Sequence, residues 1–206
     1  ALFSVIMQYD MKKYAYQEKK LLIITSLSHA LSHYNMLVFP AMALPLSGFL
    51  SMEVGQVLKL SFWMYFLFGI SSLPWGMVAD RWGAVPLLVL FHVGATLSAL
   101  AAAFFLSSPF LLSVCLAGLG FFSGIYHPVG TGLVSKEMKA ISPALAVNGI
   151  FGSVGICLAP FATGLSVWLW GITAGCLLMA ALNMLVIMLM LFFPVSISGK
   201  SAPDMK

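Results

Sequence analysis

Six long apolar runs, separated by short polar connections, make up most of the sequence. Each run has about 20 residues or more, which is the length that an α-helix needs to cross a bilayer. Apolar and polar positions do not alternate along the runs, as they would in the roughly 10-residue strands of a membrane barrel. The pattern therefore predicts six transmembrane helices. They are Leu21–Leu44, Val57–Val78, Val85–Leu106, Phe110–Val134, Ala144–Val167 and Gly171–Phe193.

The connections between these runs are too short to fold as extramembrane domains. We therefore predict an all-α membrane protein with three regions: a basic N-terminal segment at 1–20, a six-helix bundle at 21–193 and a polar tail at 194–206. The composition agrees, because 61% of the residues are hydrophobic and 8% are charged. Soluble domains carry about 25% charged residues.

The chemistry of soluble enzymes has no basis in this sequence. It contains no paired-carboxylate site, no Ser–His–Asp set with an aqueous pocket and no phosphate-binding Gly–Lys loop. The cysteines, Cys115, Cys157 and Cys176, fall inside predicted spans and lack the C-x-x-C spacing of a metal site. We therefore expect no enzyme, no cofactor and no metal site.

Basic residues mark one side of the membrane. If the six helices cross in turn, nine of the ten lysines and arginines share one side, which the positive-inside rule makes cytoplasmic. Both termini are then cytoplasmic, and the net charge of +4 reflects topology and the lipid bilayer rather than nucleic acid binding. The nine are Lys12, Lys13, Lys19, Lys20, Arg81, Lys136, Lys139, Lys200 and Lys206, and Lys59 is the exception.

The polar connection "GMVADRWG" (Gly76–Gly83) lies between the second and third runs. Its glycines permit a tight reversal of the chain. Asp80 is expected just before the third helix, where it would cap free backbone N–H groups. Arg81 would pair with Asp80 or with lipid phosphate. A purely structural turn satisfies these observations.

The same connection, with its pattern G-x-x-x-D-R-x-G, also resembles the signature loop of the major facilitator superfamily. That loop follows the second helix on the cytoplasmic side and usually continues with two basic residues, where this chain has Ala84 and Val85. In the fourth run, "GIYHPVG" (Gly124–Gly130) resembles the fourth helix of a bacterial subgroup that includes fosmidomycin-resistance-type exporters.

Two further stretches are similar to this subgroup. Ser28–Leu46 is similar to its first helix, in which a histidine is followed four residues later by an acid, replaced here by His33. Gly152–Gly164 is similar to its fifth-helix glycine–proline motif, with Ala159 where glycine is usual. Together the matching stretches cover most of residues 21–167.

This resemblance implies both a fold and a transport function. Members of the family have twelve spans in two six-helix halves, and this chain resembles the N-terminal half, with two inverted three-helix repeats. In the family, the first and fourth helices line the substrate cavity, and the signature loop gates access by contacting the other half. A second half would come from homodimerisation or from a separate membrane chain. The expected location is the bacterial inner membrane.

Apart from their ends, the predicted spans contain no Asp, Glu, Lys or Arg but hold four histidines, of which His29 and His33 share one helix face. His92 and His127 lie at a depth similar to that of His29 in other spans. Such groups usually face a cavity or a polar partner. The predicted solute or proton path is His29, His33, Asn35, Tyr126, His127 and Asn148; the predicted gate is Gly76, Asp80, Arg81 and Gly83; and the predicted helix-packing positions are Gly120, Gly124, Gly152, Gly155 and Pro160.

Several functions remain open at this point. The first is export of a small organic solute, with protons carried by histidine as the coupling ion. The second is a non-transporting structural or assembly subunit of a larger membrane complex, favoured by the missing basic pair and by the acid lost at His33. The third is a haem-binding redox subunit, because paired histidines at similar depth can ligate iron. Hydrogen bonding between helices is the simplest role for neutral imidazoles.

Overall fold

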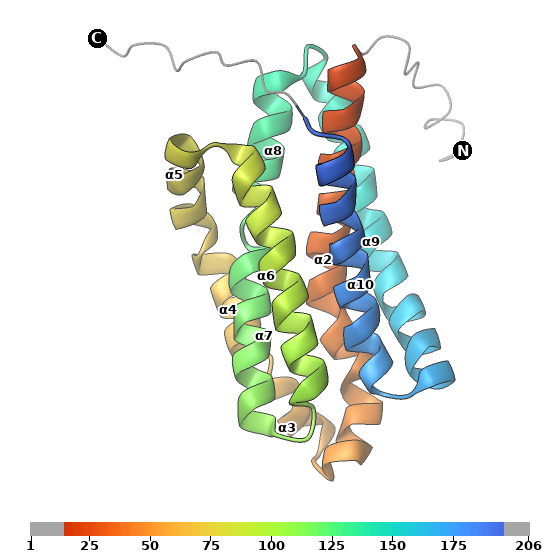
Figure 1. Cartoon of the computed structure of the whole chain (residues 1–206). Coiled ribbons are helices and arrows are strands. Elements are labelled where there is room, and N and C mark those ends of the chain that lie inside the picture. Colours follow the sequence, from red (N-terminus) through yellow and green to blue (C-terminus); the bar gives the residue numbers. More distant parts are fainter. Residues whose placement is uncertain (1–14, 196–206) are drawn as a thin grey trace.

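A computed structural model describes residues 15–195, and the regular structure in that range is α-helical. The helices pack side by side in one elongated bundle (Figure 1). They are α2 (Tyr16–Leu50), α3 (Val54–Lys59), α4 (Phe62–Ile70), α5 (Ser72–Trp82), α6 (Ala84–Phe104), α7 (Pro109–Ser123), α8 (Tyr126–Glu137), α9 (Ile141–Trp170) and α10 (Thr173–Phe192). Most of the predicted segments 1–20 and 194–206, with Lys12, Lys13, Lys200 and Lys206, lies outside the described residues.

Five stretches are long and apolar enough to cross a membrane: α2, α6, α7 with α8, α9 and α10. The helices at Val54–Ile70 and Ser72–Trp82, bent by 46°, give a sixth if they form one span. Apolar helical spans are therefore confirmed. The second predicted run, Val57–Val78, is broken into α3, α4 and α5 rather than forming one straight helix.

The breaks at α4–α5 and at α7–α8 face each other. Pro128 has no N–H group, so the carbonyl of Gly124, one turn earlier, loses its partner within the helix. The Ser72 hydroxyl at the start of α5 donates to that carbonyl at 3.3 Å. The neighbouring Ser71 hydroxyl donates to the Phe121 carbonyl, also at 3.3 Å. Hydroxyls from one break therefore satisfy carbonyls at the other.

The first helix, α2, is longer than predicted. It continues through Pro40 to Leu50, six residues beyond the end predicted at Leu44. At about 1.5 Å per residue, its 35 residues extend about 52 Å, and Figure 1 shows it running the length of the bundle. Prolines are tolerated inside membrane helices because neighbouring groups satisfy the freed backbone.

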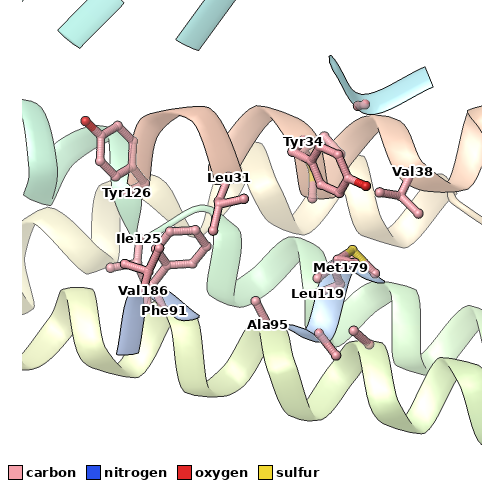
Figure 2. Packing of buried hydrophobic residues seen from close by; sticks show 14 of the residues in the cluster. Leu31, Tyr34, Val38, Phe91, Ala95, Leu119, Ile125, Tyr126, Met179 and Val186 are labelled. Carbon is pink, nitrogen blue, oxygen red and sulfur yellow. The ribbon is translucent and has the colours of Figure 1, made fainter. Parts of the chain in front are cut away.

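Most of the side chains at the centre of the bundle are apolar. α2 packs along α9, and α6 packs along both α7 and α10. Figure 2 shows side chains of α2, α6, α7 and α10 that meet there, and Phe91, Ala95 and Met179 are at most 1% exposed. This core holds α2, which contains two of the predicted site histidines, in a defined position.

Glycines allow two helix pairs to approach closely. A Cβ atom on Gly155 of α9 would collide with the backbone carbonyl of Ala30 in α2. A Cβ atom on Gly120 of α7 would collide with the backbone carbonyl of Met64 in α4. Side chains at these two positions would therefore force the helices apart, because the atoms in the way belong to the backbone.

The other predicted packing positions differ from one another. A Cβ atom on Gly124 would lie 2.5 Å from the Ser71 hydroxyl oxygen, and one on Gly152 would lie 2.7 Å from Nε2 of His29. Pro160, by contrast, is exposed on the surface of α9.

The predicted capping role of Asp80 is wrong. α5 continues to Trp82 and α6 begins at Ala84, so Gly83 alone connects them, with a φ of 85° that favours glycine. Because the reversal takes one residue, Asp80 lies in the last turns of α5 rather than at the start of α6. Its carboxylate pairs with the Lys136 ammonium of α8 at 3.2 Å, and both side chains are more than two-thirds exposed.

The Asp80–Lys136 pair is expected to contribute little to stability. Exposed ion pairs are worth about 0–1 kcal/mol because solvent screens both charges. Asp80→Asn should therefore change the free energy of unfolding, measured by SDS titration in mixed micelles, by less than about 1 kcal/mol. Lys136→Gln should give the same small change, and the double variant should add nothing. A larger loss would mean that Asp80 has a buried partner in the assembled protein.

Most described basic residues gather at one end of the bundle. α2 begins at this end, where α8 and α10 end, whereas α3 lies at the opposite end (Figure 1). Glu18 joins the start of α2 to the α8–α9 connection by accepting a hydrogen bond from the Lys139 backbone at 2.9 Å. A cytoplasmic location for this end stays a prediction of the positive-inside rule. The basic residues at this end are Lys19, Lys20, Arg81, Lys136 and Lys139. Lys59 lies in α3, at the opposite end.

Candidate functional site

Three of the four histidines meet inside the bundle. His29 and His33 lie one turn apart on α2, and His127 comes from the first turn of α8. We call them the histidine trio. Their potential ligand nitrogens all lie within 4.8 Å of one another. The rings of His29 and His127 are 5.3 Å apart and perpendicular. All three side chains are partly buried.

The partners of His29 determine which ring nitrogens carry hydrogen. Its Nδ1 lies 2.9 Å from the backbone carbonyl of Asn148 and 2.9 Å from the side-chain Oδ1 of that residue. A carbonyl only accepts, so Nδ1 carries the proton and Nε2 has a free lone pair. Nε2 of His33, 3.2 Å away, then donates to Nε2 of His29. The two imidazoles thus form a directed chain of hydrogen bonds as neutral rings.

Tyr126 and Asn148 complete a polar cluster around the trio. The Tyr126 hydroxyl donates to Oδ1 of Asn148 at 3.0 Å, and its ring stacks on His29 with 4.9 Å between centroids. Asn148 is 1% exposed. Its Nδ2 has no hydrogen-bond partner among residues 15–195. The structure therefore brings together five of the six predicted path residues, from α2, α8 and α9.

The walls of this cluster are closely fitted. Gly152 of α9 lies against the His29 ring, where any side chain would press on Nε2. Phe68 of α4 meets His127 edge to face, with 5.7 Å between centroids. The Thr131 hydroxyl donates to the His127 carbonyl one turn earlier. These contacts limit how far the imidazoles can move.

Asn35, the sixth predicted path residue, lies in a different buried network. Its Nδ2 is 3.4 Å from the Ser123 hydroxyl, and its Oδ1 accepts from Nδ2 of Asn183 at 2.9 Å. Asn183 in turn contacts His92, whose Nδ1 lies 2.9 Å from Oδ1 of Asn183. The Ser28 hydroxyl is 2.9 Å from Nε2 of His92. These residues tie α2, α6, α7 and α10 together.

His92 is therefore separate from the histidine trio. It is fully buried, and both of its ring nitrogens already have hydrogen-bond partners. The similar depth of His29, His92 and His127 in the sequence suggested a pair of haem ligands. In the structure, both ring nitrogens of His92 instead form hydrogen bonds with side chains of other helices. His92 therefore has no free nitrogen to serve as an axial ligand of haem iron.

Sequence reasoning missed several of these partners. Asn183 is an isolated polar residue within the sixth apolar run, which is the signal that could have found it. Ser28 and Phe68 gave no comparable signal, because serine and phenylalanine are common in membrane helices. Lys136, as the partner of Asp80, depends on how α5 and α8 pack.

Comparisons with known proteins identify the family of this chain. The sequence profile described as Major Facilitator Superfamily matches residues 22–205. Among solved structures, the POT family transporter PepTSo matches 87% of this chain with a TM-score of 0.71 and 18% sequence identity. The chain spans 37% of the length of that transporter, and the likeness concerns the fold. No curated protein matches the chain.

These findings assign the chain to a superfamily and not to a subgroup within it. Its apolar helices and its family make it an integral membrane protein, and this family consists of transporters rather than enzymes. The resemblance to fosmidomycin-resistance-type exporters, the cytoplasmic termini and the inverted repeats stay predictions. The chain belongs to the major facilitator superfamily of membrane transporters.

Proposed function

We propose that this bundle forms one half of a transporter that moves a small organic solute past the polar cluster. The cluster itself is the observation that supports this proposal, since three imidazoles, a phenol and an amide gather inside membrane-spanning helices. Burying such groups in a bilayer is costly, and they usually face a cavity or a polar partner. A solute with hydrogen-bonding groups is the ligand that such a wall would recognise.

A gated path needs two bundles that move against each other around the site. We propose that the second bundle is another copy of this chain, a separate membrane chain or further sequence of the same polypeptide. The solved transporter, of whose length this chain spans 37%, supports the need for it. The trio is only partly buried by this one bundle, which leaves a face for the solute.

The test is an efflux assay in bacterial cells that produce the chain with its partner bundle. Fosmidomycin is the first probe because of the resemblance in the fourth run, and a panel of small anionic and cationic drugs follows. At least one probe should accumulate less in producing cells, and His33→Ala should remove most of that difference. Cys157→Ala, at an exposed position of α9, should leave it unchanged.

The same assay also has outcomes that would contradict the transport proposal. If the wild-type chain inserts normally but lowers the accumulation of no probe, the transport proposal fails. A non-transporting subunit of a larger membrane complex would then be the better interpretation. Equal efflux by His33→Ala and wild type would remove His33 from the path.

Exchange for protons is the finer form of this proposal. It is tested in inverted vesicles of the bacterial inner membrane, which is the location we propose. Uptake of the exported probe should increase when the vesicle interior is made acidic and should stop when an uncoupler is added. Uptake that is indifferent to the uncoupler would retain the solute path and overturn proton exchange.

A further inference from the structure

The histidine trio has the geometry of a set of metal ligands. In tetrahedral coordination with metal–nitrogen bonds of about 2.0–2.1 Å, ligand nitrogens are about 3.3 Å apart. Nε2 of His29 and Nε2 of His33 are already 3.2 Å apart. The separation of nitrogens across the whole trio is at most 4.8 Å. The trio therefore lies about 1.5 Å or less from the nitrogen spacing of a tetrahedral site, and binding an ion requires the His127 nitrogen to shift by a distance of this order.

His29 has the outer contacts that metal-binding histidines show. A histidine that ligates a metal almost always donates its other ring N–H to a carbonyl or carboxylate, which directs the free lone pair at the ion. Nδ1 of His29 donates in this way to the backbone carbonyl and Oδ1 of Asn148, both at 2.9 Å. Asn148 is held in turn by the Tyr126 hydroxyl at 3.0 Å.

The ligand set indicates the class of ion. Within the part of the chain that the structure describes, the group of potential ligands consists of three imidazoles and includes no carboxylate or thiolate. Imidazole suits zinc, nickel, cobalt and copper, whereas magnesium and calcium prefer oxygen ligands. Three protein ligands leave a fourth tetrahedral position open.

We propose that His29, His33 and His127 bind one divalent transition-metal ion of the zinc class, with the fourth position open to water or to a donor atom of a solute. On binding, Nε2 of His33 gives up its shared hydrogen to its own Nδ1, so the ring stays neutral and both Nε2 lone pairs face the ion. The proposal stands on the geometry of the trio and does not require the transport function proposed above.

The experiment titrates the whole chain, purified in mild detergent through a tag that lacks histidine, with Co²⁺ as the probe. One Co²⁺ per chain should bind with the visible absorption of a tetrahedral site, and Zn²⁺ should displace it. His33→Ala and His127→Ala should each weaken binding at least tenfold. Cys157→Ala, which removes an exposed thiol of α9, should bind like wild type.

Two outcomes would overturn the proposal. The first is the absence of a stoichiometric tetrahedral Co²⁺ spectrum for the folded wild-type chain. The second is unchanged affinity in folded His33→Ala and His127→Ala variants, with folding checked by tryptophan fluorescence during thermal unfolding. Two variants from different helices, α2 and α8, keep the test decisive if one of them fails to fold.

A third variant tests the positioning role of Asn148. Loss of an outer contact of this kind typically weakens metal affinity about 10- to 100-fold. Asn148→Leu should therefore weaken Co²⁺ binding by that factor while the spectrum stays tetrahedral, because the three ligands remain. Unchanged affinity in a folded Asn148→Leu chain would show that the Asn148 side chain does not orient His29 toward an ion and that the backbone carbonyl of residue 148 is sufficient.

Discussion

Replacing Asn183 by leucine is expected to lower the free energy of unfolding by about 2–4 kcal/mol. Nδ2 of Asn183 donates to the backbone carbonyl of Met179 and to the side-chain Oδ1 of Asn35, at 2.9 Å each. Its Oδ1 therefore faces His92 and accepts from Nδ1 at 2.9 Å. Leucine retains the volume but leaves Nδ1 of His92 and Oδ1 of Asn35 without this partner.

The size of the effect follows from burial. Asn35, His92 and Asn183 are all 0% exposed, so water cannot replace the lost bonds. A buried group left unpaired costs about 1–3 kcal/mol, and measured values within membranes lie toward the lower end. Two such groups give the expected range.

SDS titration in mixed micelles measures this loss, with Met184→Leu on the exposed side of α10 as the control. The control should stay within about 0.5 kcal/mol of wild type, as surface substitutions usually do. Combining Asn183→Leu with His92→Leu should cost less than the sum of the single variants, because removing both partners leaves fewer groups unpaired. Strictly additive losses would show that the two side chains do not interact.

The second large effect is expected at Gly155. Gly155→Leu should destabilise the bundle by about 3 kcal/mol, at the upper end of the range for overpacking. The new side chain would meet the backbone carbonyl of Ala30, which cannot rotate away as a flexible side chain would. α9 must therefore move away from α2, and this movement would also break the contacts of His29 with Asn148.

Gly164→Leu, on the same helix, is the matched control. A Cβ atom on Gly164 would have no neighbour within 4 Å among the described residues. Leucine there should be neutral or stabilising by up to about 1 kcal/mol, because glycine is a poor helix former. Thermal unfolding in detergent compares the two variants. Equal midpoints would show that α2 and α9 do not depend on close approach at Gly155.

Much of the fold follows from the local pattern of apolar residues. The largest error of the sequence-based prediction is that the second and fourth runs were each expected to form one continuous helix, whereas both are broken. The apolar runs predict helical spans because a bilayer imposes about the same length on every crossing helix. The breaks at Ser71 and Gly124 escaped prediction because each depends on hydroxyl–carbonyl contacts with the other. Asp80 was misplaced because a single glycine makes the whole reversal between α5 and α6.

By itself, the sequence determined that the chain crosses a membrane and that His29 and His33 share a helix face, since both follow from helix geometry within one segment. Only the tertiary structure decided that His127 and Asn148 join them and that His92 and Asn35 do not. The reason is physical: these partners lie on different helices. Their meeting depends on how closely the helices approach, which the glycines of α7 and α9 permit at particular points along α4 and α2.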